Sequence, residues 1–143
     1  MKKKIIRLSL FLGLIMVGIF LGVYLFNQDD ERIFNNMNLS NTKNIYVQFG
    51  GHGRYKLTEE EKERFFEIHS NIEIYDEYKN DEVWIGSDSA SFVVEQTNGR
   101  RIEIDPIPPH ILINGERYSI ELESKTALKE FQEFISELKD ENF

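Results

Sequence analysis

A long apolar run near the start of the chain constrains its architecture more than any other feature. From residue 8 to residue 26 the sequence is LSLFLGLIMVGIFLGVYLF, interrupted only by Ser9 and by glycines, which membrane helices tolerate. Counted from Ile5 the run has 22 residues, and a helix of that length spans roughly 33 Å. The hydrocarbon core of a bilayer is roughly 30 Å thick, so the run is long enough to cross a membrane.

Two interpretations of this run differ in whether it is removed. A secretory signal peptide ends in small residues at its cleavage site, whereas this run ends in Tyr24, Leu25 and Phe26. The chain also has no cysteine, which excludes the lipid-attachment route of bacterial lipoproteins. We therefore expect an uncleaved transmembrane anchor, with a cleaved signal peptide as the alternative.

Charges on either side of the run predict its orientation. Four basic residues precede it within the first seven positions, and residues 29–31 shortly after it are all acidic. The positive-inside rule then places the N-terminus in the cytoplasm and the remainder outside the cell membrane. We predict a basic tip and anchor at residues 1–27, a juxtamembrane spacer at 28–44 and an extracytoplasmic domain at 45–143.

The exported part is strongly acidic. Residues 27–143 contain 13 basic and 25 acidic side chains, a formal net charge of −12. Such a charge repels nucleic acid and anionic lipid headgroups and attracts cations or basic proteins, although acidity also serves solubility alone. We therefore expect no nucleic acid among its partners. Without cysteines, the domain must be stabilised by its apolar core rather than by disulfides.

The spacer is rich in asparagine but contains four apolar residues, Ile33, Phe34, Met37 and Leu39. These residues either extend the membrane helix or dock on the domain, and the sequence leaves both alternatives open.

Local patterns predict the first half of the domain. Residues 45–49 alternate between apolar and polar in the two-residue period of a half-buried strand. Thr58 followed by Glu61 forms a capping box, which predicts a helix that runs to about His69. Three further elements are expected to follow, namely a short strand at 72–75, an acidic loop at 76–82 and a short strand at 83–85 around Trp84.

Two Asn-Gly pairs predict hairpins whose registers follow from the apolar pattern. In the first hairpin a two-residue loop mixes apolar and polar residues on both faces. A three-residue loop at 97–99 instead pairs Val94 with Ile102 and separates the faces. In the second hairpin a two-residue loop at 114–115 places the apolar residues of both strands on one face.

The remaining elements complete the predicted fold. Residues 105–110, DPIPPH, contain three prolines that cannot donate ladder hydrogen bonds, so we expect an extended crossing or a sheet edge. An amphipathic helix capped by Ser124 or Thr126 ends the chain, and its acidic polar face favours packing on its own domain over lipid. The order of elements predicts an α+β domain with an antiparallel sheet of about five to six strands and two helices on one face.

Few residues have the spacing that catalysis or ligand binding requires. The segment QFGGHGR at 48–54 lacks the lysine and hydroxyl of a Walker loop and the third glycine of a dinucleotide loop, so we interpret it as a flexible loop. The histidines His52, His69 and His110 lack the spacing of a metal site. No serine lies in a nucleophile elbow. We therefore predict no catalytic residue, no metal site and no cofactor.

Loops on a rigid scaffold usually carry recognition. Two loops fit this description, the glycine-rich loop at residues 50–55 and the proline-rich segment at residues 105–110. The binding residues that we predict in them are His52, Arg54, Tyr55, Pro108 and His110.

The layout of the chain resembles a group of known domains. A basic-flanked anchor, a short spacer, the hairpin ILINGERYSI and a closing helix are similar to small exported or membrane-anchored domains of Gram-positive bacteria, most of which lack assigned functions. The resemblance covers most of the chain and implies an extracytoplasmic location and a non-catalytic role. It transfers no active-site residue. Lipid-attached members of that group have a cysteine near the membrane, and this chain has none.

Three functions are compatible with these features. The first is a single-pass membrane protein whose acidic exported domain binds another protein or an envelope component without catalysis. The second is an envelope enzyme or metal-dependent hydrolase that uses His52 or His110 with nearby carboxylates. The third is an immunity or inhibitor protein that neutralises a basic partner.

Overall fold

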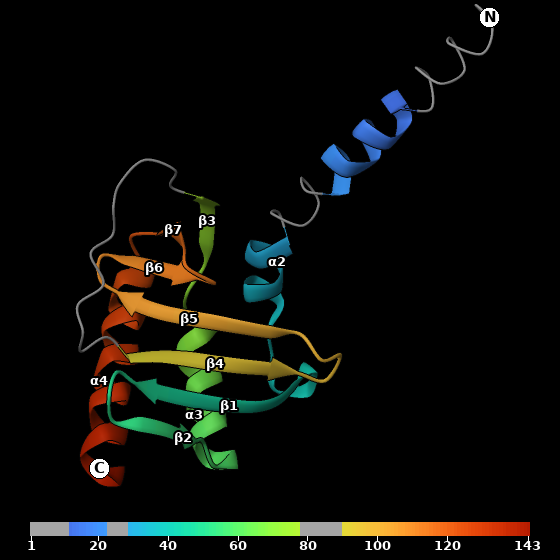
Figure 1. Ribbon diagram of the computed structural model, residues 1–143. Helices are drawn as coiled ribbons and strands as arrows, with labels where there is room; N and C mark the ends of the chain where they lie inside the picture. The colour runs from blue at the N-terminus through green and yellow to red at the C-terminus, as the bar shows by residue number, and fades with distance from the viewer. Residues whose placement is uncertain (1–11, 23–28, 78–89) are drawn as a thin grey trace, which may run out of the picture.

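The computed structural model describes residues 12–22, 29–77 and 90–143 (Figure 1). Residues 12–22 form a helix with exposed side chains. The remainder of the predicted anchor, most of the predicted acidic loop and the predicted strand around Trp84 lie outside the described residues. Within the described ranges, no helix combines the length and hydropathy of a membrane span.

The described part of the domain is built on a seven-stranded antiparallel sheet (Figure 1). The strands are β1 (Thr42–Phe49), β2 (Gly53–Lys56), β3 (Ile74–Glu77), β4 (Ala90–Gln96), β5 (Arg101–Ile107), β6 (His110–Ile113) and β7 (Glu116–Ile120). Their order in space is β2-β1-β4-β5-β6-β7-β3. The predicted α+β class and antiparallel sheet are confirmed. The predicted strand number was too low, because β2 begins at Gly53, inside the segment 48–54 that the sequence predicts to be a flexible loop.

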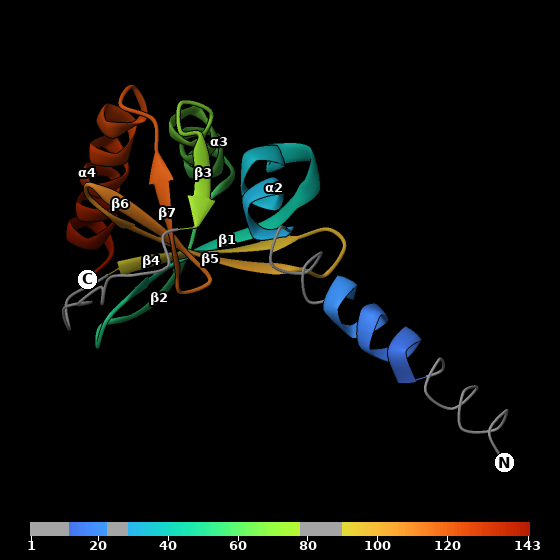
Figure 2. The ribbon, with the colours of Figure 1, turned by 90° about the horizontal axis from the view of Figure 1, so that it is seen from above.

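Helices cover one face of this sheet (Figure 2). They are α2 (Asp29–Asn36), the 3₁₀ helix η1 (Leu39–Asn41), α3 (Glu59–His69) and α4 (Ser124–Asn142). The two expected helices correspond to α3 and α4, and α2 packs beside them on the same face.

The two domain helices begin differently. In α3 the predicted capping box is confirmed, since Glu61 N donates to Thr58 Oγ1 at 3.3 Å and Thr58 N donates to Glu61 Oε2 at 2.6 Å. In α4 the predicted cap is wrong. The helix begins at Ser124, whose hydroxyl instead accepts a hydrogen bond from Glu73 N at 3.1 Å. A long-range contact has therefore replaced the local cap.

Both predicted hairpin registers are confirmed. Val94 lies opposite Ile102 across the three-residue loop, and Ile111 lies opposite Tyr118 across the two-residue loop. In the second loop the backbone of Asn114 has a φ of 52°, a conformation that asparagine tolerates better than most residues.

The expectation for the proline-rich segment is corrected. It is neither an edge nor a crossing, because β5 continues through Pro106, which lies opposite Ile111 of β6. The turn that joins the two strands contains a cis peptide bond between Pro108 and Pro109. The register between β4 and β5 reaches only to Ile104, so the missing N–H of Pro106 removes no hydrogen bond on that side.

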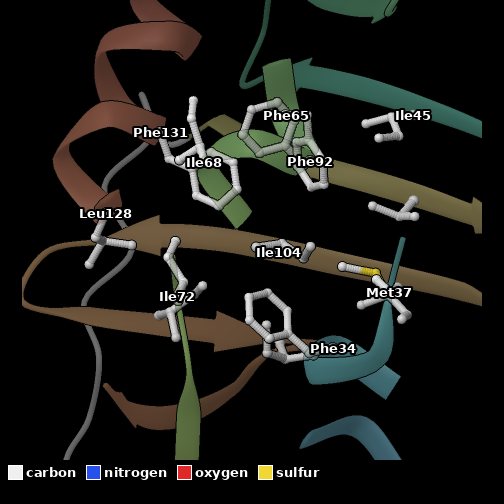
Figure 3. Close-up of a cluster of buried hydrophobic side chains, with 14 of the residues drawn as sticks. Phe34, Met37, Ile45, Phe65, Ile68, Ile72, Phe92, Ile104, Leu128 and Phe131 are labelled. Atoms are coloured by element: carbon white, nitrogen blue, oxygen red, sulfur yellow. The ribbon is translucent and has the colours of Figure 1, made fainter. Parts of the chain in front are cut away.

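The core lies between the sheet and the helices (Figure 3). Phe65 of α3 is fully buried, and its ring centroid lies 4.9 Å from that of Phe92 in β4 and 5.1 Å from that of Phe131 in α4. This aromatic cluster therefore joins the sheet to α3 and α4. Phe34 and Met37 of the predicted spacer are also buried in this core, so this part of the spacer docks on the domain.

Polar contacts fix α2 against the rest of the domain. Asn35 Nδ2 donates to the carbonyl oxygen of Ile74 at 3.1 Å, and Ile74 N donates to Asn35 Oδ1 at 3.3 Å. Asn114 Nδ2 donates to Asp30 Oδ1 at 3.1 Å. The helix α2 is therefore an integral part of the fold.

Candidate functional site

The short strand β2 separates two of the predicted binding residues. Neighbouring side chains of a strand point to opposite faces of the sheet. Arg54 lies on the face away from the helices, with its guanidinium carbon 3.7 Å from the ring centroid of Tyr46 and Nη2 3.7 Å from Glu95 Oε1. Tyr55 lies on the helix side, where its hydroxyl donates to Glu61 at 3.1 Å. The two side chains therefore lie on opposite faces of the sheet and contact different residues.

The other predicted binding residues lie in two turns at one end of the sheet. His52 is exposed in the turn between β1 and β2. Pro108 belongs to the turn between β5 and β6, and His110 begins β6. Because β1 and β5 run in the same direction with β4 between them, both turns lie at the same end, with roughly 10 Å between β1 and β5. Their role in binding stays a prediction.

His69 ends α3, as the sequence predicts. Its ring is buried between α3 and α2, with Nε2 2.8 Å from the carbonyl oxygen of Phe34. Burial lowers the pKa of His69, and the hydrogen bond to Phe34 opposes this shift. Across residues 12–22, 29–77 and 90–143, no three His, Asp or Glu side chains are grouped as a metal site requires.

A groove with a volume of about 520 Å³ lies between α3 and α4. Its lining residues are Thr58, Glu60, Glu61, Glu63, Arg64, Glu67, Phe134, Glu137, Leu138 and Glu141. We refer to this set as the α3–α4 groove. Six carboxylates and one guanidinium face it, over an apolar floor of Phe134 and Leu138.

The one cation among these lining residues is engaged within the groove. Arg64 Nη1 contacts Glu137 Oε2, and the Arg64 guanidinium carbon lies 4.7 Å from the ring centroid of Phe134. The hydrogen bond to Arg64 lowers the pKa of Glu137, and the same bond raises the pKa of Arg64. The groove thus binds a guanidinium from its own chain by a carboxylate and an aromatic face.

Tyr55 connects the groove to the sheet. Its hydroxyl lies 3.1 Å from both Glu61 carboxylate oxygens, and Glu61 also accepts from Thr58 N. Burial raises the pKa of Tyr55, and the hydrogen bond to Glu61 adds to the shift. Of the five predicted binding residues, Tyr55 is the one that supports a wall of this groove.

Helix dipoles make the two walls electrostatically different. Carboxylates near the N-terminus of α3 are stabilised by its dipole, whereas Glu137 and Glu141 lie toward the C-terminus of α4, where negative charge is unfavourable. Lys139 is the basic residue in the last turn of α4. A cation bound in the groove therefore offsets the unfavourable interaction of Glu137 and Glu141 with the C-terminal end of α4.

The groove residues were not predicted from the sequence, although their spacing contains a signal. Glu60, Glu63 and Glu67 recur at helical spacing on α3, and Glu137 and Glu141 do so on α4. Each helix taken alone shows an ordinary solvated polar face. Only the antiparallel packing of α3 on α4 brings the two acidic stripes together.

A carboxyl group with a raised pKa lies on the opposite face of the sheet. Asp105 in β5 is buried, and burial raises its pKa to about 6, with a further contribution from the charge of Glu103. Glu103 lies two residues away on the same face and accepts a hydrogen bond from Ser91 Oγ at 3.2 Å. This pair is distinct from the α3–α4 groove.

The chain was compared with known proteins in three ways. No protein-family model, no curated protein and no solved structure matches it.

Proposed function

We propose that this chain is a single-pass membrane-anchored protein whose acidic extracytoplasmic domain binds a basic segment of a partner protein, without catalysis, in the α3–α4 groove. The observation that carries the proposal is the combination of six carboxylates with an apolar floor in a groove of about 520 Å³. Grooves of this size suit specific ligand binding. The formal net charge of −12 on residues 27–143 also favours encounter with a basic partner.

The arrangement of the carboxylates favours a polypeptide over a single cation. Glu60 and Glu67 are seven residues apart on α3, so their backbone positions span roughly 10 Å along the helix. Glu137 and Glu141 face them from α4. Negative charge is therefore spread along the groove, as a segment with several lysines or arginines requires.

Arg64 gives an example of how such a side chain is held. Its guanidinium contacts Glu137 and lies over the ring of Phe134. An arginine from a partner can use the same two kinds of contact with other groove carboxylates. Neutralisation of a basic partner by an immunity or inhibitor protein is one form of this function and uses the same surface.

The test measures binding of a labelled lysine- and arginine-rich peptide to the full-length chain in an uncharged detergent, by fluorescence anisotropy at low and high salt. A triple variant, Glu60→Gln, Glu63→Gln and Glu67→Gln, removes three exposed groove charges. It leaves Glu61 and Glu137, which make structural contacts, in place. We expect affinity to fall by about tenfold or more, since each charge contributes roughly 0.5–1 kcal/mol.

A matched control separates the groove from overall charge. The triple variant Glu73→Gln, Glu121→Gln and Glu123→Gln makes the same change in net charge at exposed positions outside the groove. It should weaken binding by less than about threefold. Equal loss in both triple variants, or binding of a glutamine-substituted peptide with the same affinity, contradicts the proposal.

A further inference from the structure

The guanidinium of Arg64 occupies a position in the α3–α4 groove where two kinds of contact coincide. Its Nη1 contacts Glu137 Oε2 on α4, and its guanidinium carbon lies 4.7 Å from the ring centroid of Phe134. A carboxylate beside the cation and an aromatic ring under it form a site that suits a planar guanidinium. We refer to Glu137 and Phe134 as the guanidinium site.

The guanidinium site is fixed by the core. Phe134 is 1% exposed, and its ring lies nearly parallel to that of Phe92 in β4, with centroids 6.0 Å apart and an interplanar angle of 26°. Glu137 follows Phe134 by three residues on α4, so both side chains lie on the same side of the helix. A preformed site of this kind loses little conformational entropy when a ligand binds.

Arg64 itself is held weakly in the guanidinium site. Its side chain is 46% exposed and that of Glu137 is 50% exposed, and ion pairs this open to water contribute little to stability. Glu60 and Glu67 lie one turn before and one turn after Arg64 on α3. Arg64 can therefore leave the guanidinium site and still lie close to carboxylates.

Lysine reproduces only part of the contacts that Arg64 makes. Its ammonium is a compact and strongly hydrated point charge, whereas a guanidinium is planar, weakly hydrated and able to stack on a ring while it pairs with a carboxylate. The other groove carboxylates attract both kinds of cation through charge alone. The difference between arginine and lysine is therefore concentrated at Phe134 and Glu137.

We propose that the α3–α4 groove selects arginine over lysine, and that an arginine of the basic partner displaces Arg64 from the guanidinium site. This inference rests on the proposed function and names the side chain that the groove recognises. Arg64 acts as an internal ligand that fills the site until such a partner binds. A partner whose basic residues are all lysines binds through the remaining carboxylates, with lower affinity.

The test compares two labelled peptides of equal length and charge, one with arginine and one with lysine at every basic position. Fluorescence anisotropy measures their binding to the full-length chain in an uncharged detergent. The arginine peptide should bind wild type at least about fivefold more tightly than the lysine peptide. In Phe134→Leu, which removes the aromatic face but keeps an apolar floor, this ratio should fall below about twofold.

Phe66→Leu is the matched control, because Phe66 is a partly buried phenylalanine of α3 that does not line the groove. It should keep the ratio of the two affinities found for wild type. A thermal unfolding scan checks that Phe134→Leu is folded, and if it is not, a second readout on wild type decides. This readout is the side-chain Nε–H signal of Arg64 in ¹H–¹⁵N spectra, assigned by its absence in Arg64→Gln. The signal should shift on saturation with the arginine peptide and stay near its original position with the lysine peptide.

The outcomes separate this inference from the proposed function. Equal affinity of wild type for the two peptides, or tighter binding of the lysine peptide, overturns the selection of arginine and leaves the proposed function standing. An Arg64 signal that the arginine peptide does not shift, or an equal change of the ratio in Phe134→Leu and Phe66→Leu, also overturns the inference alone. Absence of binding by both peptides contradicts the proposed function as well.

Discussion

The Nε2 atom of His69 lies 2.8 Å from the carbonyl oxygen of Phe34, and this contact joins the end of α3 to α2. The two rings also meet edge to face with centroids 4.6 Å apart. The imidazole is buried, so the arrangement favours a neutral ring whose Nε2–H donates to the carbonyl. Protonation of His69 should therefore weaken one of the contacts that hold α2 on the domain.

Stability should decrease as the pH falls below about 6.5. The pKa of His69 is lowered in the folded state, so below the ordinary histidine value the unfolded chain binds more protons than the folded chain. Between pH 7.5 and 5.5 this loss should be on the order of 1 kcal/mol. Urea unfolding of wild type and His69→Gln at both pH values measures it, because the variant lacks the titrating group.

His52→Gln is the matched control for this measurement, since His52 is exposed in the turn between β1 and β2. It should lose stability between the two pH values as wild type does. An acid-induced loss that is the same in His69→Gln and in wild type contradicts the role of His69.

Truncating Phe34 should destabilise the whole domain. This side chain is 0% exposed and belongs to the core that α3, α4 and the sheet form. Phe34→Ala should reduce the free energy of unfolding by about 3–5 kcal/mol, and Leu39→Ala, at a side chain that is 43% exposed, by less than about 1 kcal/mol. Equal effects in chemical denaturation would mean that α2 is not part of the cooperative unit.

Replacing Asp105 should stabilise the protein at neutral pH. Its pKa is raised from 3.8 to about 6, so the folded state binds more protons than the unfolded state between these values and stability falls as the pH rises through them. Asp105→Asn should therefore increase the free energy of unfolding at pH 8 by about 2 kcal/mol and by much less near pH 4. A gain that does not change with pH would contradict this explanation.

Replacing Arg64 should strengthen the binding of a basic peptide. Arg64 occupies part of the α3–α4 groove and partly neutralises it through Glu137. Arg64→Gln frees Glu137 and the face of Phe134, so the affinity for a lysine- and arginine-rich peptide should rise roughly three- to tenfold. Anisotropy measurements show the change, and a loss of affinity would mean that Arg64 does not compete with the ligand.

Local signals were sufficient for much of the fold. The capping box of Thr58 and Glu61 and the register of Val94 with Ile102 depend on residues close in sequence, and both were predicted correctly. The missed cap of α4 has a different cause. Ser124 bonds to Glu73, a residue 51 positions away, and no local pattern contains that contact.

The candidate sites were less predictable for the same reason. Tyr55 was singled out as a loop residue, but its role in the α3–α4 groove depends on β2 pairing with β1 and facing α3. The α3–α4 groove also combines Glu60 with Glu137, which are far apart in the chain. Predicting these sites requires the packing of α2, α3 and α4, which the periodicity of each helix does not determine.

The central claim is that a basic segment binds along α3 and α4. The most direct test records ¹H–¹⁵N spectra of the full-length chain in an uncharged detergent during addition of the lysine- and arginine-rich peptide. We predict that the largest shift changes fall on Glu60, Glu63, Glu67, Glu137 and Glu141 and their neighbours. Changes confined to the turns that contain His52, Pro108 and His110, or no changes at saturating peptide, would show that the peptide does not bind in the α3–α4 groove.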